Sequence, residues 1–487
     1  MSSQLLRLLK RMKLHLNHLA PPTTRQSTAF AVIAVIIFCF CLVGIFSRPL
    51  TYLAIFWPAN AVLFALFLRF PNLSNAGGWL GAFSGYMLAD LLTGNHFQLT
   101  LFLTFANLIN TTVCLFFMRY FQVNYQNYNK DFTIITMSAI IAGGGCLAGA
   151  TFAIFTIPYI PNTFMSSDRL LIDFGMWWIT EIINYLIILP LILSFPTIIQ
   201  IKNAFQNRRN QNYHFKDLLP VISVALCVLL TAVFTGPGAI LYPLAALIWA
   251  ALSYQLFTLA IINAVVILAT YYNLNSFYLA DSSMTYLSTA ISVRIGLTML
   301  ILGPLILCVI SRNRHDLYKK VLYLANHDSL THAMNRRFFF EQGELYLKSR
   351  TELTFSIIML DIDHFKKLND QHGHYVGDLV LQKFSDIVRN NLREKDLFAR
   401  IGGEEFVILL SNIQADDAQR IAERIRNIVE TTSIQVNENH QLFITVSIGI
   451  IHQNLPDTPN LQYLINQADQ ALYQAKQSGR NQVILAS

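Results

Sequence analysis

One stretch of the chain decides the fold: Asp396 to Leu410, which reads DLFARIGGEEFVILL. Its two ends, residues 396–400 and 405–410, predict the paired strands of a hairpin, and the four residues between them predict its turn. Glycine in a tight turn lets a ligand approach the backbone, and carboxylates beside it can hold a cation. The stretch therefore predicts a β-hairpin with a ligand site at its turn.

Besides the hairpin, a buried strand is predicted at residues 354–360, which read TFSIIML and lead directly into Asp361 and Asp363. Acids without a nearby His or Cys pair favour magnesium, usually shared with the phosphates of a nucleotide. Helices alternate with strands around the hairpin, which predicts an α+β domain. Further strands are predicted at 443–451 and 481–485, and helices at 335–348, 376–392, 415–430 and 460–478.

The remainder of the chain has the composition of a membrane protein. Of 487 residues, 54% are hydrophobic and 13% are charged, whereas a soluble domain carries about 25% charged residues. A soluble enzyme is therefore excluded, and charges become frequent again from Ser311 onward, after the long apolar region. We predict four segments: a basic N-terminal segment at 1–28, an all-α membrane domain at 29–310, a linker helix at 311–326 and the α+β domain at 327–487.

Ten apolar segments approach the length of about 20 residues that a helix needs to cross a bilayer. The eighth and ninth nearly abut at Ser253 and Tyr254, so the expected count lies between eight and ten. Basic residues before the first segment and after the last predict that both termini are cytoplasmic. The segments are 29–47, 51–69, 77–94, 98–118, 133–157, 172–198, 218–235, 237–252, 254–272 and 287–310.

Two classes of function are excluded by charge and cysteine placement. Much of the net charge of +7 lies in loops beside the membrane, where it orients the protein, so it does not indicate a nucleic-acid partner. The six cysteines fall within apolar segments and show no metal-ligand or disulfide spacing. Thiol chemistry is therefore not expected.

Ionisable side chains inside apolar segments are expensive to bury and mark functional sites by default. Asp90, Glu181 and Arg294 are the clearest three, and two interpretations stay open: they form a sensory ligand site, or they pair only to hold the bundle together. The stretch from Phe56 to Ala61, the third segment ending in Ala89-Asp90-Leu91, and Trp177 through Leu191 resemble the MASE1 family of bacterial membrane sensory domains. That resemblance implies a bacterial inner-membrane location and an unidentified small-molecule or protein signal.

The linker is predicted to be a helix with apolar residues at Leu317, Val321 and Leu324. Spacings of four and then three residues are typical of the seam of a short parallel coiled coil. The linker would then join the membrane domain to a pair of C-terminal domains.

Several motifs occur in order through the C-terminal domain. Asp328 to Thr331 precede Asn335-Arg336-Arg337; Asp361 to Lys366, Asn369-Asp370 and Gly377-Asp378 follow; then come Gly402 to Phe406, Lys476 and Gly479-Arg480-Asn481. This arrangement resembles the GGDEF family of diguanylate cyclases, in the variant that reads GGEEF. The resemblance implies a β-sheet palm with helices on one side, related to class III nucleotidyl cyclases. One departure is His332-Ala333, where the family usually has Gly-Leu, and it would affect regulation rather than chemistry.

The resemblance implies that two GTP molecules condense to cyclic di-GMP with release of two pyrophosphates, in a site shared by two copies of the domain. Two Mg²⁺ or Mn²⁺ ions per GTP are implied. Their protein ligands would be Asp361, Glu404 and the Ile362 carbonyl, with Glu405 as a further catalytic acid. The implied GTP-binding residues are Asn369 and Asp378 at the guanine, Lys366, Lys476 and Arg480 at the triphosphate, and Phe365, Gly402 and Gly403 around the nucleotide.

Arg393 and Asp396 match the RxxD inhibitory site of the family, which binds cyclic di-GMP away from the active site. Arg424, on the next predicted helix, is a second expected contact. Two other classes of function stay open: a catalytically silent receptor for GTP or cyclic di-GMP, and a transporter. An altered signature or missing triphosphate contacts would favour the receptor, and the sequence has neither.

Overall fold

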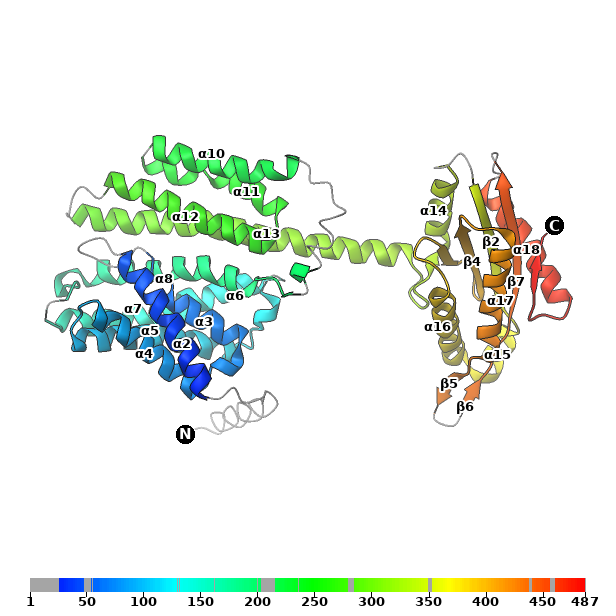
Figure 1. The fold of residues 1–487 in the computed structure, drawn as a ribbon, viewed down its shortest axis with the longest axis horizontal. Coiled ribbons are helices and arrows are strands. Elements are labelled where there is room, and N and C mark those ends of the chain that lie inside the picture. Colours follow the sequence, from blue (N-terminus) through cyan, green and yellow to red (C-terminus); the bar gives the residue numbers. More distant parts are fainter. Residues whose placement is uncertain are drawn as a thin grey trace. The chain divides into compact units, whose positions relative to one another are not determined.

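The computed structural model describes residues 26–47, 54, 56–128, 130, 132–161, 163–198, 200–202, 215–234, 236–278, 284–348, 353–437, 440–455 and 460–486. Most of the predicted N-terminal segment, 1–28, lies outside the described residues. The chain forms two compact units, Met1–His315 and Asp316–Ser487, which are described separately below. Figure 1 shows helices alone in the first unit and a sheet with helices in the second.

The first unit is a bundle of apolar helices (Figure 1). Each of the ten predicted segments contains a helix, and seven helices in the described part of the chain are long and apolar enough to cross a membrane. The predicted count of eight to ten spans is therefore not confirmed. The helices are α2 (Gln26–Phe46), α3 (Ala59–Arg69), α4 (Ala76–Leu92), α5 (Phe97–Tyr120), α6 (Thr133–Ile140), α7 (Leu147–Thr156), α8 (Leu170–Leu193), α10 (Leu219–Val233), α11 (Leu244–Ser253), α12 (Leu256–Tyr278) and α13 (Met284–Asn326).

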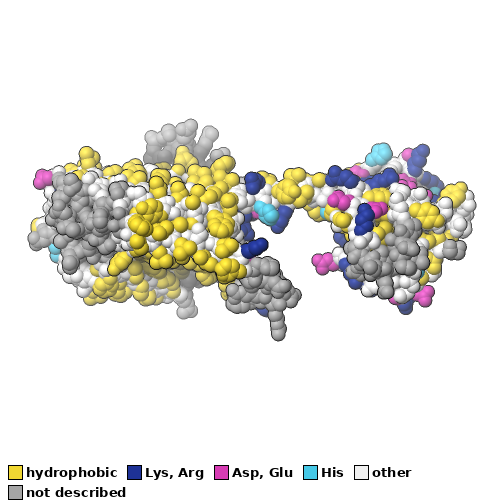
Figure 2. All heavy atoms as spheres, turned by 90° about the horizontal axis from the view of Figure 1, so that it is seen from above, with side chains coloured by type: hydrophobic (Ala, Val, Ile, Leu, Met, Phe, Trp, Pro, Cys, Tyr) yellow, Lys and Arg dark blue, Asp and Glu magenta, His cyan; other side chains and the backbone are white. Residues whose placement is uncertain are grey.

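Small residues set the closest packing in this bundle. Gly81 and Gly85 lie one turn apart on α4 and face α2, where a Cβ at Gly85 would stand 2.8 Å from the Ala34 carbonyl oxygen. Such contact between backbones is typical of helices that associate within lipid, because apolar burial alone does not drive association there. On the outside, large apolar side chains such as Leu229 are exposed, and hydrophobic atoms dominate the surface of this unit in Figure 2. This surface suits contact with lipid.

Helix α13 joins two segments that the sequence analysis separated. The predicted last span, 287–310, and the predicted linker, 311–326, form one uninterrupted helix from Met284 to Asn326. Its C-terminal part exposes Leu317, Val321 and Leu324, each to 60% or more. The predicted seam is therefore solvent-exposed in the single chain.

The second unit is built on a six-stranded sheet in the order β1-β3-β4-β2-β7-β8. The long strand β2 pairs antiparallel with β4 on one side and with β7 on the other. The predicted hairpin is confirmed as β3 and β4, while β1, β5, β6 and α15 were not predicted. The strands are β1 (Met334–Asn335), β2 (Leu353–Ile362), β3 (Leu397–Arg400), β4 (Glu405–Ser411), β5 (Ile434–Asn437), β6 (His440–Leu442), β7 (Val446–Leu455) and β8 (Val483–Leu485).

The predicted α+β architecture on a β-sheet palm is confirmed, but helices cover both faces of the sheet, so the implied placement of helices on one side is wrong for this chain. Alternate residues of a strand point to opposite faces. Ile358 and Leu360 of β2 join a core with α16 and α17, whereas Ile357 and Met359 join a second core with α14 and α18. The helices are α14 (Arg336–Lys348), α15 (Phe365–His372), α16 (His374–Asn390), α17 (Ala415–Thr431) and α18 (Leu461–Gln477).

The His332 departure has a local explanation in the backbone. His332 has φ +56°, in the left-handed region that glycine adopts most readily. The turn around it is held by Asp328, whose backbone N–H donates to Ala333 and whose carboxylate accepts from Thr331. The chain therefore keeps the turn with a histidine in it.

Candidate functional site

The strand register brings the acids together at the end of β2. Asp361 lies opposite Glu405 of β4 and opposite Ser447 of β7. The next residue, Ile362, donates its backbone N–H to the Glu404 carbonyl over 3.4 Å. A sheet edge therefore carries Asp361 and the Glu404–Glu405 pair, which are more than forty residues apart in the sequence.

Asp361 is 4% exposed and forms an ion pair with Lys476 of α18, with 2.7 Å between Oδ2 and Nζ. Burial raises the pKa of Asp361 to about 6; Lys476 opposes this rise, while the nearby Glu404 and Glu405 add to it. The carboxylate thus lies where negative charge is in excess. An arrangement of this kind favours binding of a cation, because the cation relieves both the desolvation and the repulsion.

Arg400 holds the backbone of the turn between β3 and β4. Its Nε and Nη2 donate to the Gly403 carbonyl over 3.1 and 2.6 Å, and its Nη1 lies 3.1 Å from Oδ1 of Asp328. The Glu405 carboxylate lies against Gly402, where a side chain would collide with it. Gly403 has open space beside its Cα. The backbone of the turn is therefore accessible to a ligand.

The donor set at this edge suits Mg²⁺ or Mn²⁺. The described residues contain no group of three or more His, Cys, Asp or Glu side chains in a metal-binding arrangement. The expected set of metal ligands needs only two such side chains, because Asp361 and Glu404 would supply carboxylates and Ile362 would supply a backbone carbonyl. Magnesium is commonly bound by one or two carboxylates together with water and substrate phosphates.

Asn369 of α15 carries a buried acceptor that no described group satisfies. Its Oδ1 is buried without a hydrogen-bond partner and lies against Gly377 of α16, where a Cβ would collide with it. Phe365 packs beneath the same contact and is 6% exposed. A buried unsatisfied oxygen is costly, so this position suits a ligand that brings an N–H donor.

The other expected nucleotide contacts are on the surface. Lys366, Asp378 and Arg480 are exposed, and among the described residues no hydrogen bond or ion pair joins their side chains to Asn369 or Asp361. Asp363 was not among the predicted metal or nucleotide ligands. Asp363 is 6% exposed and accepts hydrogen bonds from Thr445, Ser447 and the backbone of Asn481, so it joins β2 to the turn that carries Arg480. The position of Asp363 two residues after Asp361 was the sequence feature that could have indicated this role.

Comparisons with known proteins agree with this geometry. Residues 325–482 match the family model described as diguanylate cyclase, GGDEF domain. The probable diguanylate cyclase DgcF of Escherichia coli (strain K12) is 30% identical over 273 residues, which cover 55% of this chain and 85% of that protein. The chain belongs to the GGDEF family of diguanylate cyclases.

Two further relatives show how far the similarity extends. The probable diguanylate cyclase DgcF of Escherichia coli O157:H7 is 26% identical over 456 residues, 91% of each chain. The uncharacterized protein YhcK of Bacillus subtilis (strain 168) is 41% identical over 175 residues, 35% of this chain and 48% of YhcK. The chain therefore spans about half the length of YhcK, and the aligned region is about the size of the GGDEF domain alone.

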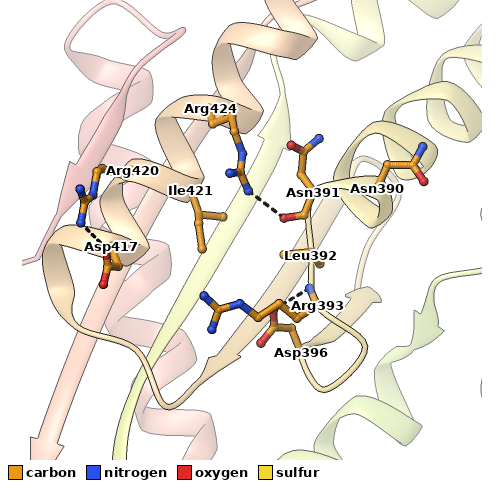
Figure 3. A pocket seen from close by; sticks show the side chains of 9 residues that line it. All are labelled: Asn390, Asn391, Leu392, Arg393, Asp396, Asp417, Arg420, Ile421 and Arg424. Atoms are coloured by element: carbon orange, nitrogen blue, oxygen red, sulfur yellow. Dashed lines mark hydrogen bonds and ion pairs between the residues drawn. The ribbon is translucent and has the colours of Figure 1, made fainter.

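A pocket of about 560 Å³ in the GGDEF domain contains the predicted inhibitory residues (Figure 3). Arg393 and Arg424 line it together with Arg420, which lies one turn before Arg424 on α17 and was not predicted. Arg424 donates to the Asn391 carbonyl over 3.0 Å, and Arg420 pairs with Asp417. Asp396 accepts from the backbone N–H groups of Arg393 and Ser411, so it also fixes the turn that presents Arg393.

The three candidate residues of the membrane unit do not form one cluster. Glu181 of α8 accepts from the amides of Asn60 and Asn110 over 3.0 and 3.2 Å. Arg294 of α13 contacts Met176 and Tyr271 instead, and does not pair with Glu181. Of the two open interpretations, pairing of these residues with one another does not occur between Glu181 and Arg294, and a sensory ligand site stays a prediction. Asp90 accepts from Asn95 over 3.0 Å at the end of α4.

Proposed function

We propose that the protein is a membrane-anchored diguanylate cyclase that condenses two GTP to cyclic di-GMP and two pyrophosphates. The observation that carries the proposal is the edge of the sheet at which buried Asp361, Lys476 and the Gly402–Glu405 turn meet. An acid cluster beside an accessible backbone turn suits a metal–triphosphate, and family membership supplies the reaction.

In this proposal the protein residues orient two nucleotides for an in-line displacement. The 3′ oxygen of one GTP forms a bond to the α-phosphorus of the other, and the bond to the departing pyrophosphate breaks. Glu405 lies at the turn, where it is suited to accept the 3′-hydroxyl proton. Mg²⁺ or Mn²⁺, two ions per GTP, would neutralise triphosphate charge beside Asp361 and Glu404.

The remaining nucleotide contacts follow from the chemistry of the side chains. The unsatisfied oxygen of Asn369 suits the N–H groups of the guanine edge, and Asp378 would accept from the same edge. Lys366, Lys476 and Arg480 would bind triphosphate oxygens. The ion pair between Lys476 and Asp361 then has to open or be shared when a metal–nucleotide enters.

One domain offers one nucleotide site, so the reaction requires a homodimer with two GGDEF domains facing each other. The exposed seam of Leu317, Val321 and Leu324 on α13 is suited to pair two copies. Because α13 also belongs to the bundle, a change in a MASE1-like membrane domain would reach the cyclase through one helix. The site is proposed to lie on the cytoplasmic side of a bacterial inner membrane, under control of a signal that the structure leaves unidentified.

We further propose that the pocket of Arg393, Asp396, Arg420 and Arg424 binds cyclic di-GMP and inhibits the enzyme. Three guanidinium groups around one pocket suit phosphates and guanine edges. Arg393→Ala should relieve product inhibition without lowering the initial rate. An unchanged inhibition constant in Arg393→Ala and in Arg420→Ala would remove the pocket from regulation.

The decisive experiment measures cyclic di-GMP formation from GTP and Mg²⁺ by the detergent-purified full-length chain. Wild type should form product, and Glu405→Ala should not, while both proteins retain the same thermal transition. Equal turnover in the two proteins would contradict the assignment of the site. GTP binding without turnover in wild type would instead favour a silent receptor.

A further inference from the structure

The turn that follows α18 has an unusual backbone. Gly479, Arg480 and Asn481 have φ angles of +115°, +62° and +48°, so three successive residues lie in the left-handed region. Arginine and asparagine rarely adopt this region, because the Cβ then crowds the backbone, and asparagine tolerates it better than arginine. Such a turn persists only where its surroundings hold it.

The backbone of the turn is fixed from the sheet. Oδ2 of Asp363 accepts the N–H of Asn481 over 3.1 Å, and the same oxygen accepts the Thr445 hydroxyl over 2.7 Å. Ser447 donates to Oδ1, also over 2.7 Å. The N–H of Arg480 donates to the carbonyl of Ala475 over 3.0 Å. These bonds fix the main chain and leave the side chain of Asn481 free to make others.

The side chain of Asn481 is held by α17. Nη1 of Arg426 donates to Oδ1 of Asn481, and Nδ2 of Asn481 donates to Oε1 of Glu430, each over 2.9 Å. Arg426 also pairs with Glu430 and with Glu423, at 2.7 and 2.8 Å, and its side chain is only 15% exposed. Both ends of one amide are therefore satisfied by one helix.

We propose that Arg426 and Glu430 are positioning residues of the cyclase reaction, because through Asn481 they hold the turn that presents Arg480 to the GTP triphosphate. The inference rests on the proposed role of Arg480. Neither residue belongs to the motifs that identify the family, and neither touches the expected nucleotide site. A planar guanidinium suits phosphate only when its direction is fixed, so the support of the turn affects binding of GTP.

Charge and geometry both separate this cluster from an ordinary pair on a helix surface. Hydrogen bonds from Arg426 and then Asn481 hold the pKa of Glu430 below its usual value, and Glu423 is the largest cause of the raised pKa of Arg426. Glu344 and Lys348 on α14 form a pair of the same i,i+4 spacing, but at 3.8 Å and with a lysine that is 77% exposed. This pair is a matched control.

The test is a double-mutant cycle on the full-length protein, with kcat and KM measured for GTP with Mg²⁺. Arg426→Met and Glu430→Leu should each raise KM and lower kcat/KM by about tenfold, as loss of a supporting residue commonly does. Arg480→Ala should cause a loss at least as large. Adding Arg426→Met to Arg480→Ala should cause no further loss, because the residue that it positions is gone. Glu344→Leu should leave both constants unchanged.

A second variant separates positioning from folding. Asn481→Gly removes the amide but keeps a residue that accepts the left-handed turn, so it should reproduce the effect of Arg426→Met even if that variant folds poorly. Losses that multiply in the Arg426→Met/Arg480→Ala protein, or an Asn481→Gly protein with normal KM, would overturn the inference. The same set of variants can be compared by their Kd for GTP with Mg²⁺, a measurement that needs no turnover. If the wild type binds GTP but forms no product, the proposed function is contradicted while the positioning role can still be tested.

Discussion

The two units of this protein bury carboxylates in opposite ways. Glu181 in the membrane unit is 3% exposed and is held by the neutral amides of Asn60 and Asn110. Asp361 in the GGDEF domain is 4% exposed, but its partner is the cation Lys476, with two more acids nearby. Asp328 in the same domain is likewise held by a cation, Arg400.

Under the proposed function, this difference distinguishes a structural network around Glu181 from a binding site at Asp361. Amides donate hydrogen bonds to Glu181 from α3 and α5, and these amides are themselves bonded to Tyr86 and Tyr185, so the network is closed. Asp361 lies beside an accessible turn, and a single lysine offsets an excess of negative charge. A closed network stabilises helix packing. An incompletely neutralised site suits a cation.

The largest effect is expected at Asp361. Asp361→Asn removes the charge that would hold the metal–triphosphate, so cyclic di-GMP formation should fall by about a thousandfold or more. The thermal transition should stay close to that of wild type, because asparagine keeps the shape of the side chain. Turnover within tenfold of wild type would mean that the acid cluster is not the cation site.

Glu181 should act on stability instead. Glu181→Ala removes the acceptor of the buried Asn110 amide and one of the two acceptors of the Asn60 amide, whose Nδ2 also donates to Asn107, so the unfolding free energy should fall by about 3 kcal/mol. Glu181→Gln keeps one acceptor and should cost less. Unfolding of the full-length protein in detergent gives both values. If Glu181→Ala has normal stability but an altered rate of cyclic di-GMP formation, Glu181 is a sensory residue. The contrast between Glu181 and Asp361 would then be wrong.

A smaller effect is expected at Asp328. Burial acts to raise its pKa, but hydrogen bonds from Thr331 and the pairing with Arg400 outweigh burial and hold the pKa below its usual value of 3.8. Asp328→Asn should therefore lower the unfolding free energy by about 1 kcal/mol at neutral pH. The difference should disappear as the pH falls through the lowered pKa. A difference that is independent of pH would show that the charge of Asp328 is not the cause.

The smallest effect on stability is expected at Arg294. The guanidinium is 2% exposed, and within the described part of the chain its Nε has no partner and its other contacts are with Met176 and Tyr271 rather than with a carboxylate. Arg294→Met should leave the unfolding free energy within about 1 kcal/mol of wild type or raise it, because no described carboxylate pairs with this buried cation, and an unpaired buried cation stabilises little. A loss of about 3 kcal/mol would place Arg294 with Glu181 as a structural residue.

Local sequence predicted most elements of the GGDEF domain. The hairpin at 396–410 and the helices at 335–348, 376–392, 415–430 and 460–478 agree with β3, β4, α14, α16, α17 and α18 to within two residues. Periodicity sufficed for the helices because each buries one regular face, whereas β4 is buried on both faces and was predicted from its apolar run after the Gly-Gly turn. The short strands β1, β5 and β6 have too few residues to show a period, and α15 begins at a left-handed His364 that no pattern signals.

The apolar helical unit and the GGDEF domain were predictable from the sequence, because composition, hydropathy and motif order are properties of the linear chain. Which polar groups meet depends on the tertiary structure. It separated Glu181 from Arg294, placed helices on both faces of the sheet, and joined Asp363, Arg426 and Glu430 around Asn481. Those contacts link residues as far as 118 positions apart, and such pairings are set by the packing of whole elements, which no local pattern records.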